Sequence, residues 1–211
     1  MKRKRGILMG LFVIIFLVLV LLDNFFIEIM KLIRTNILTE MFRVITNPLF
    51  GVTLLILIPC FVFLLNRQKE KTYFIAIGLS IAGLINYLLK ITVMRLRPFE
   101  TGIISTLPSL AKNSYLTWNS SFPSFHAMFA FFSLPILVKE FPKFKYFWWP
   151  LTILITFSRI YLGLHFLSDS FVGAVIGYGL GYYIWNIKNK KKVLKEILEP
   201  VDEFFKKFKK N

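Results

Sequence analysis

The chain has 211 residues, of which 56% are hydrophobic and 18% are charged, and its formal net charge is +16. The apolar residues occur in long blocks, which indicates an integral membrane protein rather than a soluble domain. The Lys and Arg residues cluster at the edges of these blocks, so they indicate orientation and attraction to anionic lipid rather than nucleic-acid binding. The single cysteine, Cys60, excludes an intramolecular disulfide and argues against a thiolate metal site.

Six apolar blocks follow one another along the chain, over residues 7–22, 49–65, 73–89, 125–138, 146–157 and 164–187. With their flanks, each is close to the roughly 20 residues that a helix needs to cross the hydrocarbon core. The first block follows a basic start and is not followed by a small-residue cleavage site, so we expect a retained transmembrane helix rather than a signal peptide. The pattern predicts an all-α bundle of six transmembrane helices over residues 1–187.

The distribution of basic residues predicts the orientation of this bundle. With the N-terminus inside, the cytoplasmic segments are 1–6, 66–71, 139–146 and 188–211, which carry 4, 3, 3 and 9 of the 27 Lys and Arg residues. Because positive charge favours the cytoplasmic side, we expect a multi-pass protein of the cell (inner) membrane with both termini in the cytoplasm.

Two further patterns concern the end of the chain. Residues 188–211 repeat apolar residues at helical spacing among lysines, which favours a basic amphipathic cytoplasmic tail on the anionic inner leaflet, with a simple solvated tail as the alternative. Gly173, Gly177 and Gly181 recur at every fourth residue of the last block and predict close helix contact. We expect that contact within one chain rather than in a dimer, and the oligomeric state stays open.

Two cations close the third apolar block, which we expect to continue as a helix toward Pro98. Lys90 and Arg97 are seven residues apart, or about two helical turns, so they would share one face of that helix. Arg97 alone would be explained by snorkelling to the interface. Lys90 lies two turns deeper, and a buried pair of cations favours the binding of an anion.

The fourth block opens with Pro123, Ser124, Phe125 and His126, a pattern typical of a helix start. The free backbone N–H groups of such a terminus bind phosphate well. A helix cap explains Ser124, but it does not explain a histidine in the first turn. This histidine is therefore a candidate functional residue.

The second of the two histidines, His165, lies four residues before Asp169. On a helix this pair would share one face, and a carboxylate that holds one imidazole nitrogen leaves the other nitrogen able to attack. A structural hydrogen bond is the alternative for such a pair taken alone. Arg159 would face elsewhere on an unbroken helix, so we expect a bend at Gly163.

These three segments resemble the signature of the type 2 phosphatidic acid phosphatase (PAP2) family, which shares its active site with vanadium haloperoxidases. Residues 90–98 match the pattern K-x6-RP, and residues 158–169 match SR-x5-H-x3-D. Residues 123–126 match PSGH except that Phe125 replaces the family glycine. Phenylalanine still supplies the backbone N–H, so we expect activity with an altered preference for substrate shape.

The resemblance implies an enzyme that removes phosphate from a lipid headgroup. His165 is implied as the nucleophile that forms a phosphohistidine, Asp169 as the residue that orients it, and His126 as the proton donor to the leaving oxygen. The residues implied to bind the phosphate oxygens are Lys90, Arg97, Ser124, Phe125 and Arg159. Because three cations balance the phosphate charge and no carboxylate cluster suits a hard metal, we expect metal-independent catalysis without a cofactor.

The predicted topology places this site on the outer, periplasmic face at the edge of the membrane, which favours a lipid phosphate as the substrate. Undecaprenyl pyrophosphate or a phospholipid phosphate, such as phosphatidylglycerophosphate or phosphatidic acid, is expected. Three alternatives stay open: a lipid A 1-phosphatase, a lipid phosphotransferase, and a non-catalytic lipid-binding or transport protein that reuses the anion site.

Overall fold

The structure, a computed structural model, describes residues 2–47, 50–51, 53–105 and 120–187, together with 192–193, 195–196 and 199 of the tail. Its ordered elements, all helical, are α1 (Lys2–Ile33), α2 (Asn36–Thr46), the π-helical η1 (Thr53–Leu57), α4 (Ile58–Leu65), α5 (Lys69–Val93), α7 (Phe125–Glu140), the 3-10 turn η3 (Pro142–Phe144), α8 (Lys145–Tyr161) and α9 (Leu167–Trp185). The predicted all-α fold is therefore confirmed. The tail prediction lies for the most part outside the described residues.

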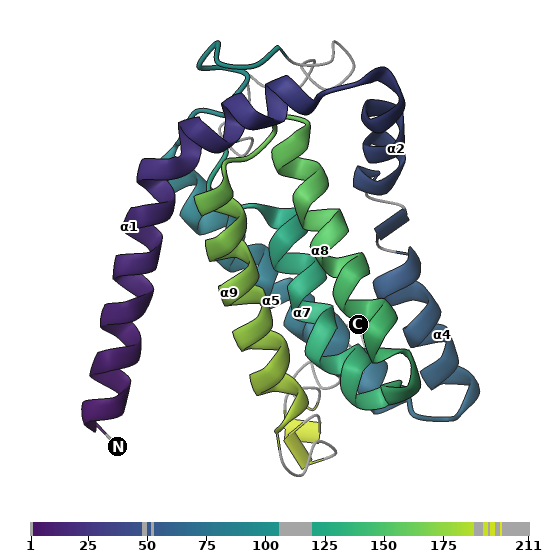
Figure 1. Ribbon diagram of the computed structural model, residues 1–211. Helices are drawn as coiled ribbons and strands as arrows, with labels where there is room; N and C mark the ends of the chain where they lie inside the picture. The colour runs from purple at the N-terminus through teal and green to yellow at the C-terminus, as the bar shows by residue number, and fades with distance from the viewer. Residues whose placement is uncertain are drawn as a thin grey trace, which may run out of the picture.

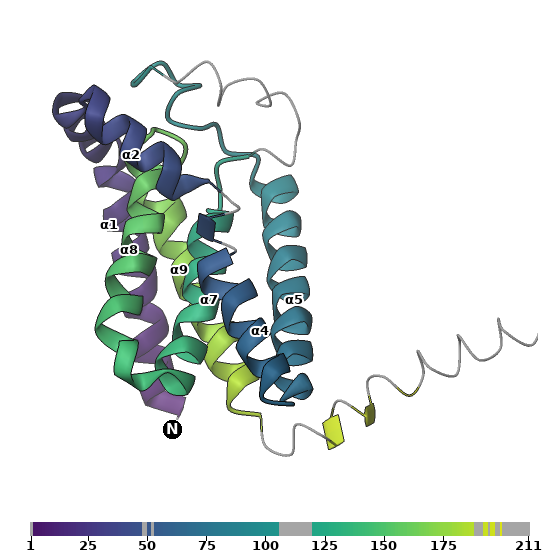
Figure 2. The ribbon, with the colours of Figure 1, turned by 90° about the vertical axis from the view of Figure 1, so that its right-hand side faces the viewer.

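The helices α4, α5, α7, α8 and α9 run side by side as a bundle (Figures 1 and 2). The long helix α1 packs against α9 and α8, and its first turns diverge from the bundle (Figure 1). The short helix α2 follows after a turn at the far end and packs against α8. Thr35 caps the start of α2 by accepting a hydrogen bond from the backbone N–H of Leu38.

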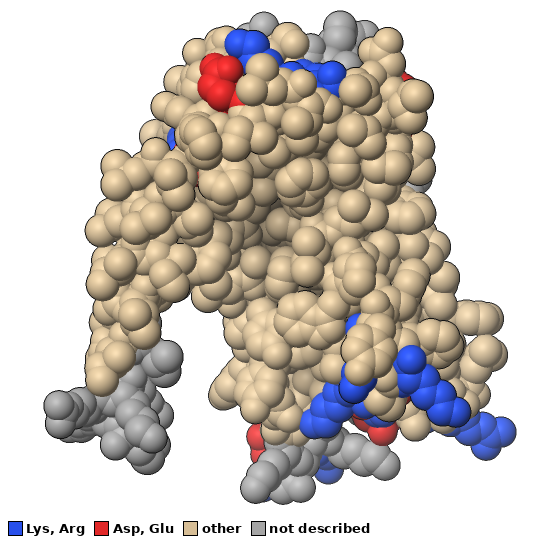
Figure 3. Space-filling model, in the orientation of Figure 1, with Lys and Arg blue, Asp and Glu red and all other residues tan. Residues whose placement is uncertain are grey.

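Two helical stretches, Met9–Ile33 and Lys69–Val93, are long and apolar enough to cross a membrane by length and composition. The remaining predicted spans correspond to shorter helices, so the number of six stays a prediction. Large apolar side chains point outward, including Leu21, Leu32 and Ile37, which are 82%, 82% and 83% exposed. On the face of the molecule that Figure 3 shows, charged side chains lie at the two ends. A wide band between the ends has none, as a lipid environment requires.

The closest helix pair in the bundle is α7 with α9, and glycines make this contact possible. A Cβ atom on Gly177 would lie 2.0 Å from the Met128 backbone oxygen, and one on Gly181 would lie 2.1 Å from that of Phe132. Gly173 faces the Ser124 oxygen in the same way. The glycine repeat thus packs within the chain, as the sequence predicts.

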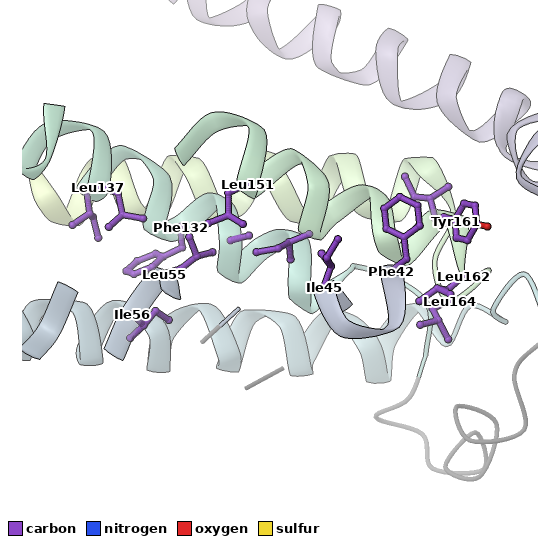
Figure 4. Close-up of a cluster of buried hydrophobic side chains, with 14 of the residues drawn as sticks. Phe42, Ile45, Leu55, Ile56, Phe132, Leu137, Leu151, Tyr161, Leu162 and Leu164 are labelled. Atoms are coloured by element: carbon purple, nitrogen blue, oxygen red, sulfur yellow. The ribbon is translucent and has the colours of Figure 1, made fainter. Parts of the chain in front are cut away.

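The apolar core extends along the bundle (Figure 4). At one end, Phe132 of α7 packs near Leu55 and Leu151. At the other end, Phe42 of α2 lies 4.5 Å from Tyr161 of α8, measured between ring centroids. This packing fixes α2 beside the C-terminal end of α8.

The prediction that α5 continues to Pro98 is wrong, because α5 ends at Val93. Met94 takes a left-handed conformation with φ 46°, and its N–H bonds to the oxygen of Lys90. Residues 94–97 then run without helical structure, and the backbone oxygen of Arg95 accepts from the Ser121 N–H at 2.8 Å. Lys90 and Arg97 therefore do not share a helical face.

The helical pairing of His165 with Asp169 is also wrong, because α9 begins only at Leu167. The preceding helix ends at Tyr161, and the chain turns at Gly163, whose φ is 69°. Glycine adopts this left-handed geometry without strain. The predicted bend at Gly163 is thus present, and it sets His165 on the connection between two helices.

Candidate active site

A cavity of about 390 Å³ lies near the N-terminal ends of α7 and α9, and it collects side chains from segments far apart in the sequence. Its lining residues are Gly83, Asn86, Tyr87, Lys90, Arg97, Phe125, His126, Arg159 and His165. All predicted site residues except Ser124 and Asp169 line this cavity. The breaks after α5 and α8 bring them together, where continuous helices would have kept them apart.

His165 is almost fully buried beside the cavity, and its ring orientation is fixed. Its Nδ1 lies 2.6 Å from the Ser121 backbone oxygen, which can only accept, so Nδ1 carries the proton. Nε2 therefore carries the lone pair, which accepts from the Arg97 guanidinium at 3.5 Å and lies beside the cavity.

Asp169 lies behind His165 rather than in hydrogen-bond contact with it. Its Oδ2 is 3.9 Å from His165 Nδ1, so the direct hydrogen bond expected from the sequence is not formed. The carboxylate instead accepts from the Ser121 hydroxyl, from the Phe166 N–H at 2.8 Å and from Arg95 at 2.7 Å. Asp169 thereby fixes Ser121, whose carbonyl group holds the histidine.

His126 lies in the first turn of α7 and lines the same cavity. Its ring is hydrogen-bonded to the backbone of Thr46, the last residue of α2. Its Nε2 is buried and has no hydrogen-bond partner among the described residues. This nitrogen is therefore available to a group that enters the cavity.

The three cations are held mainly by neutral oxygens. Lys90, 7% exposed, donates to the Ser120 backbone oxygen. Arg97 donates to the Leu164 oxygen at 2.8 Å, and Arg159 donates to the Thr46 hydroxyl at 2.6 Å. Arg97 also lies within electrostatic reach of the carboxylates Glu100 and Asp169, and three cations around one cavity favour an anion there.

Ser124 takes a different position from the one expected of a phosphate ligand, whereas Phe125 lines the cavity. Ser124 is fully buried and caps α7 by accepting from the Ala127 N–H, and it does not line the cavity. Phe125 packs against Phe129, with ring centroids 5.4 Å apart. Together with His126, Phe125 also borders a second, apolar cavity of about 170 Å³, whose other lining residues are Gly51, Leu55, Phe129, Ala130 and Ile155.

Several residues that the sequence analysis did not select support the site. Thr46 binds His126 and Arg159, and Ser121 binds His165 and Asp169. Asp23 and Arg95 extend this network behind Asp169. Asp23 is an acid directly after an apolar block and could have been noticed for that reason, but Thr46 and Ser121 carry no signal in the sequence.

Within the described part of the chain, no group of three or more His, Cys, Asp or Glu side chains is arranged to hold a metal ion. The donors around the cavity are instead cationic or imidazole side chains. Such a set fits a phosphate or another oxyanion better than a metal ion.

The profile of the PAP2 superfamily matches residues 71–192. An uncharacterized protein of Methanocaldococcus jannaschii is 28% identical over 150 residues, which span 68% of this chain and 59% of that relative. The crystal structure of a transmembrane PAP2-type phosphatidylglycerolphosphate phosphatase from Bacillus subtilis has a TM-score of 0.62 at 24% identity, covering 87% of this chain and 94% of its own. The crystal structure of Aquifex aeolicus LpxE has a TM-score of 0.59 at 26% identity, covering 79% of this chain and 96% of its own.

The matched profile covers more than half of the chain and includes all three motif segments. Both structural neighbours share the helical fold over most of their length. The chain is therefore a membrane protein, and it belongs to the PAP2 superfamily.

Proposed function

We propose that the protein hydrolyses a phosphate monoester or pyrophosphate on a membrane lipid through a phosphohistidine intermediate. One observation carries this proposal: both histidines and the cations Lys90, Arg97 and Arg159 line one cavity of about 390 Å³. A phosphoryl group bound there would have a neutral nucleophile on one side and a proton donor on the other. Phosphoryl transfer requires mainly such positioning and compensation of charge.

In the first step, the Nε2 lone pair of His165 attacks phosphorus while the bond from phosphorus to the leaving oxygen breaks. His126, in its protonated form, gives its Nε2 proton to that oxygen. Lys90, Arg97 and Arg159 balance the charge on the non-bridging oxygens, and the backbone N–H at Phe125 contributes as part of a helix N-terminus. Ser124 supports this terminus through its cap.

In the second step, water attacks the phosphorus of the phosphohistidine and the phosphorus–nitrogen bond breaks. His126, now neutral, takes a proton from the water and is ready for the next cycle. His165 regains its lone pair, and inorganic phosphate leaves. No metal ion takes part in either step.

The substrate class is supported by the apolar cavity that shares Phe125 and His126 with the polar one. We propose that the lipid chain leaves the polar cavity on this side, past Phe125. Undecaprenyl pyrophosphate or a phospholipid phosphate is the proposed substrate, and a phosphate on lipid A fits the site as well. Phe125 would then select the shape of the lipid next to its phosphate.

We also propose a six-span topology with the site on the outer face and residues 188–211 as a cytoplasmic tail. The cavity lies at the N-terminal end of α7, and the basic segment 139–146 follows its C-terminal end. The N-terminus lies at that same basic end of the bundle (Figure 1). The positive-inside rule then places the cavity outside.

The test is phosphate release from a panel of lipid phosphates in detergent, with chelator present and His165→Ala beside the wild type. Release by the wild type alone supports the proposal, and the fastest substrate identifies the lipid. Transfer of phosphate to a second lipid in place of release would identify a phosphotransferase. Equal release by both proteins, or complete loss of release in chelator, would contradict the mechanism.

A further inference from the structure

Asp23 is a buried carboxylate on a helix that is otherwise largely exposed. It is 1% exposed, whereas Leu21 and Phe25, its neighbours on α1, are 82% and 60% exposed. An ionisable group in an apolar helix is costly unless it is paired, and such groups are functional candidates. Its partners therefore indicate its role.

The first partner is Arg95, which bridges two acids. Its Nη2 donates to Asp23 at 2.8 Å, and its Nη1 donates to Asp169 at 2.7 Å. The guanidinium also lies over the Phe166 ring, 4.1 Å from the centroid. Only a planar fork of donors serves both carboxylates and the ring at once, which distinguishes arginine from lysine at this position.

The second partner is the start of α9. The backbone N–H of Ser168 donates to Asp23 at 2.9 Å, and the Ser168 hydroxyl donates to the same carboxylate. Asp23 therefore supplies, from another helix, an acceptor and a negative charge at the N-terminus of α9. It fixes the end of the helix that carries Asp169.

The contacts continue without a gap to the proposed nucleophile. Asp169 accepts from the Ser121 hydroxyl, and the Ser121 oxygen accepts from His165 Nδ1. A path of charged and polar hydrogen bonds thus joins α1 to the histidine ring. Its acidic members, Asp23 and Asp169, and the ring itself are at most 2% exposed.

We propose that Asp23 and Arg95 are positioning residues, which hold His165 in the attacking orientation through Asp169 and Ser121. The inference rests on the proposed function of His165. The two residues touch neither the cavity nor the substrate, so they act on the rate of attack rather than on binding. The negative charge that they hold in place is that of Asp169, whose Oδ2 lies 3.9 Å from His165 Nδ1 and favours the imidazole as it becomes positive on phosphorylation.

The test compares Asp23→Asn with Glu28→Gln, which removes an exposed carboxylate from the same helix. Because misplacement of a nucleophile is costly, we expect kcat for Asp23→Asn to fall roughly 10- to 100-fold with KM nearly unchanged. Glu28→Gln should match the wild type. The kcat of Arg95→Lys should fall as much as that of Asp23→Asn. In the double variant that combines Asp23→Asn with Arg95→Gln, kcat should fall by less than the product of the losses in the two single variants.

A purely structural role would lower the thermal midpoint but leave kcat per folded enzyme unchanged, and that result would overturn the proposal. Absence of turnover in the wild type would instead contradict the proposed function. The inference would then be tested by orthovanadate, which mimics the pentacoordinate phosphoryl group. If the inference holds, orthovanadate should raise the thermal midpoint of Glu28→Gln but not that of Asp23→Asn. Equal increases in the two variants would overturn it.

Discussion

The two histidines face one cavity, but they are supported in different ways. His165 is held by the Ser121 carbonyl group, behind which stand Asp169 and Arg95. Among the described residues, the hydrogen-bond partner of His126 is the neutral backbone of Thr46. A nucleophile that becomes positively charged benefits from a fixed orientation and nearby negative charge, whereas a proton donor must also release its proton. The difference in support therefore agrees with the two proposed roles.

The largest effect should come from His165→Asn, which removes the nucleophile and keeps a polar side chain of similar size. We expect kcat to fall at least about 1,000-fold, because His165 is the proposed nucleophile and the other histidine of the cavity, His126, is assigned to proton transfer. The measurement is phosphate release together with acid-labile labelling by a substrate with a radioactive phosphate. Labelling of the variant at the wild-type level would show that the intermediate forms elsewhere.

His126→Asn should have a smaller effect that depends on the leaving group. For a phosphate monoester, whose leaving group is an alkoxide, we expect a loss of roughly 100- to 10,000-fold, the usual contribution of a general acid. A lipid pyrophosphate should lose less in the first step, because its leaving phosphate is a weaker base. Single-turnover labelling with both substrates measures this step. Equal losses for both would contradict the assignment of His126 as the acid.

Much of this fold and site could be predicted because the relevant signals are local. Long apolar blocks predict helices, and the glycine repeat predicts a close contact that Gly177 indeed makes with α7. Charged residues at the edge of an apolar block stand out, so Lys90, Arg97 and His165 could be selected before their geometry was known. A shared cavity could also be expected for these residues, because buried cations require an anion or another partner.

The errors arose where long-range contacts override local helical preference. Residues 94–97 leave the helical path because Arg95 makes better contacts with Asp23, Asp169 and residue 121 than a helix would allow. Pro98 disfavours helix for the residue before it, but the helix ends earlier than that rule requires. Asp169 was assigned a direct bond to His165 because the spacing was assumed to be helical. Such partners depend on the folded arrangement and leave no pattern in the sequence.

The position of the two histidines relative to each other depends on the contact between α7 and α9, and Gly177→Ala should disturb it. Its new Cβ would lie 2.0 Å from the Met128 oxygen, a backbone atom that cannot move aside. We expect a loss of about 1–3 kcal/mol in stability, the usual cost of overpacking. Thermal unfolding in detergent measures it. Gly179→Ala is the matched control, since a Cβ there meets nothing within 4 Å, and equal midpoints for the two variants would show that the contact is not tight.

The smallest effect should come from a substitution of Thr46, which supports only the side of the cavity that carries His126. Thr46→Val keeps the backbone that binds His126 and removes the hydroxyl that accepts from Arg159 at 2.6 Å. A buried charged donor that loses its acceptor costs about 1–3 kcal/mol, so we expect kcat/KM to fall about tenfold through weaker placement of Arg159. Thr46→Ser restores the hydroxyl and should restore the rate. If valine and serine give the same rate, Arg159 does not need this acceptor, and the His126 side is held by the α2 backbone alone.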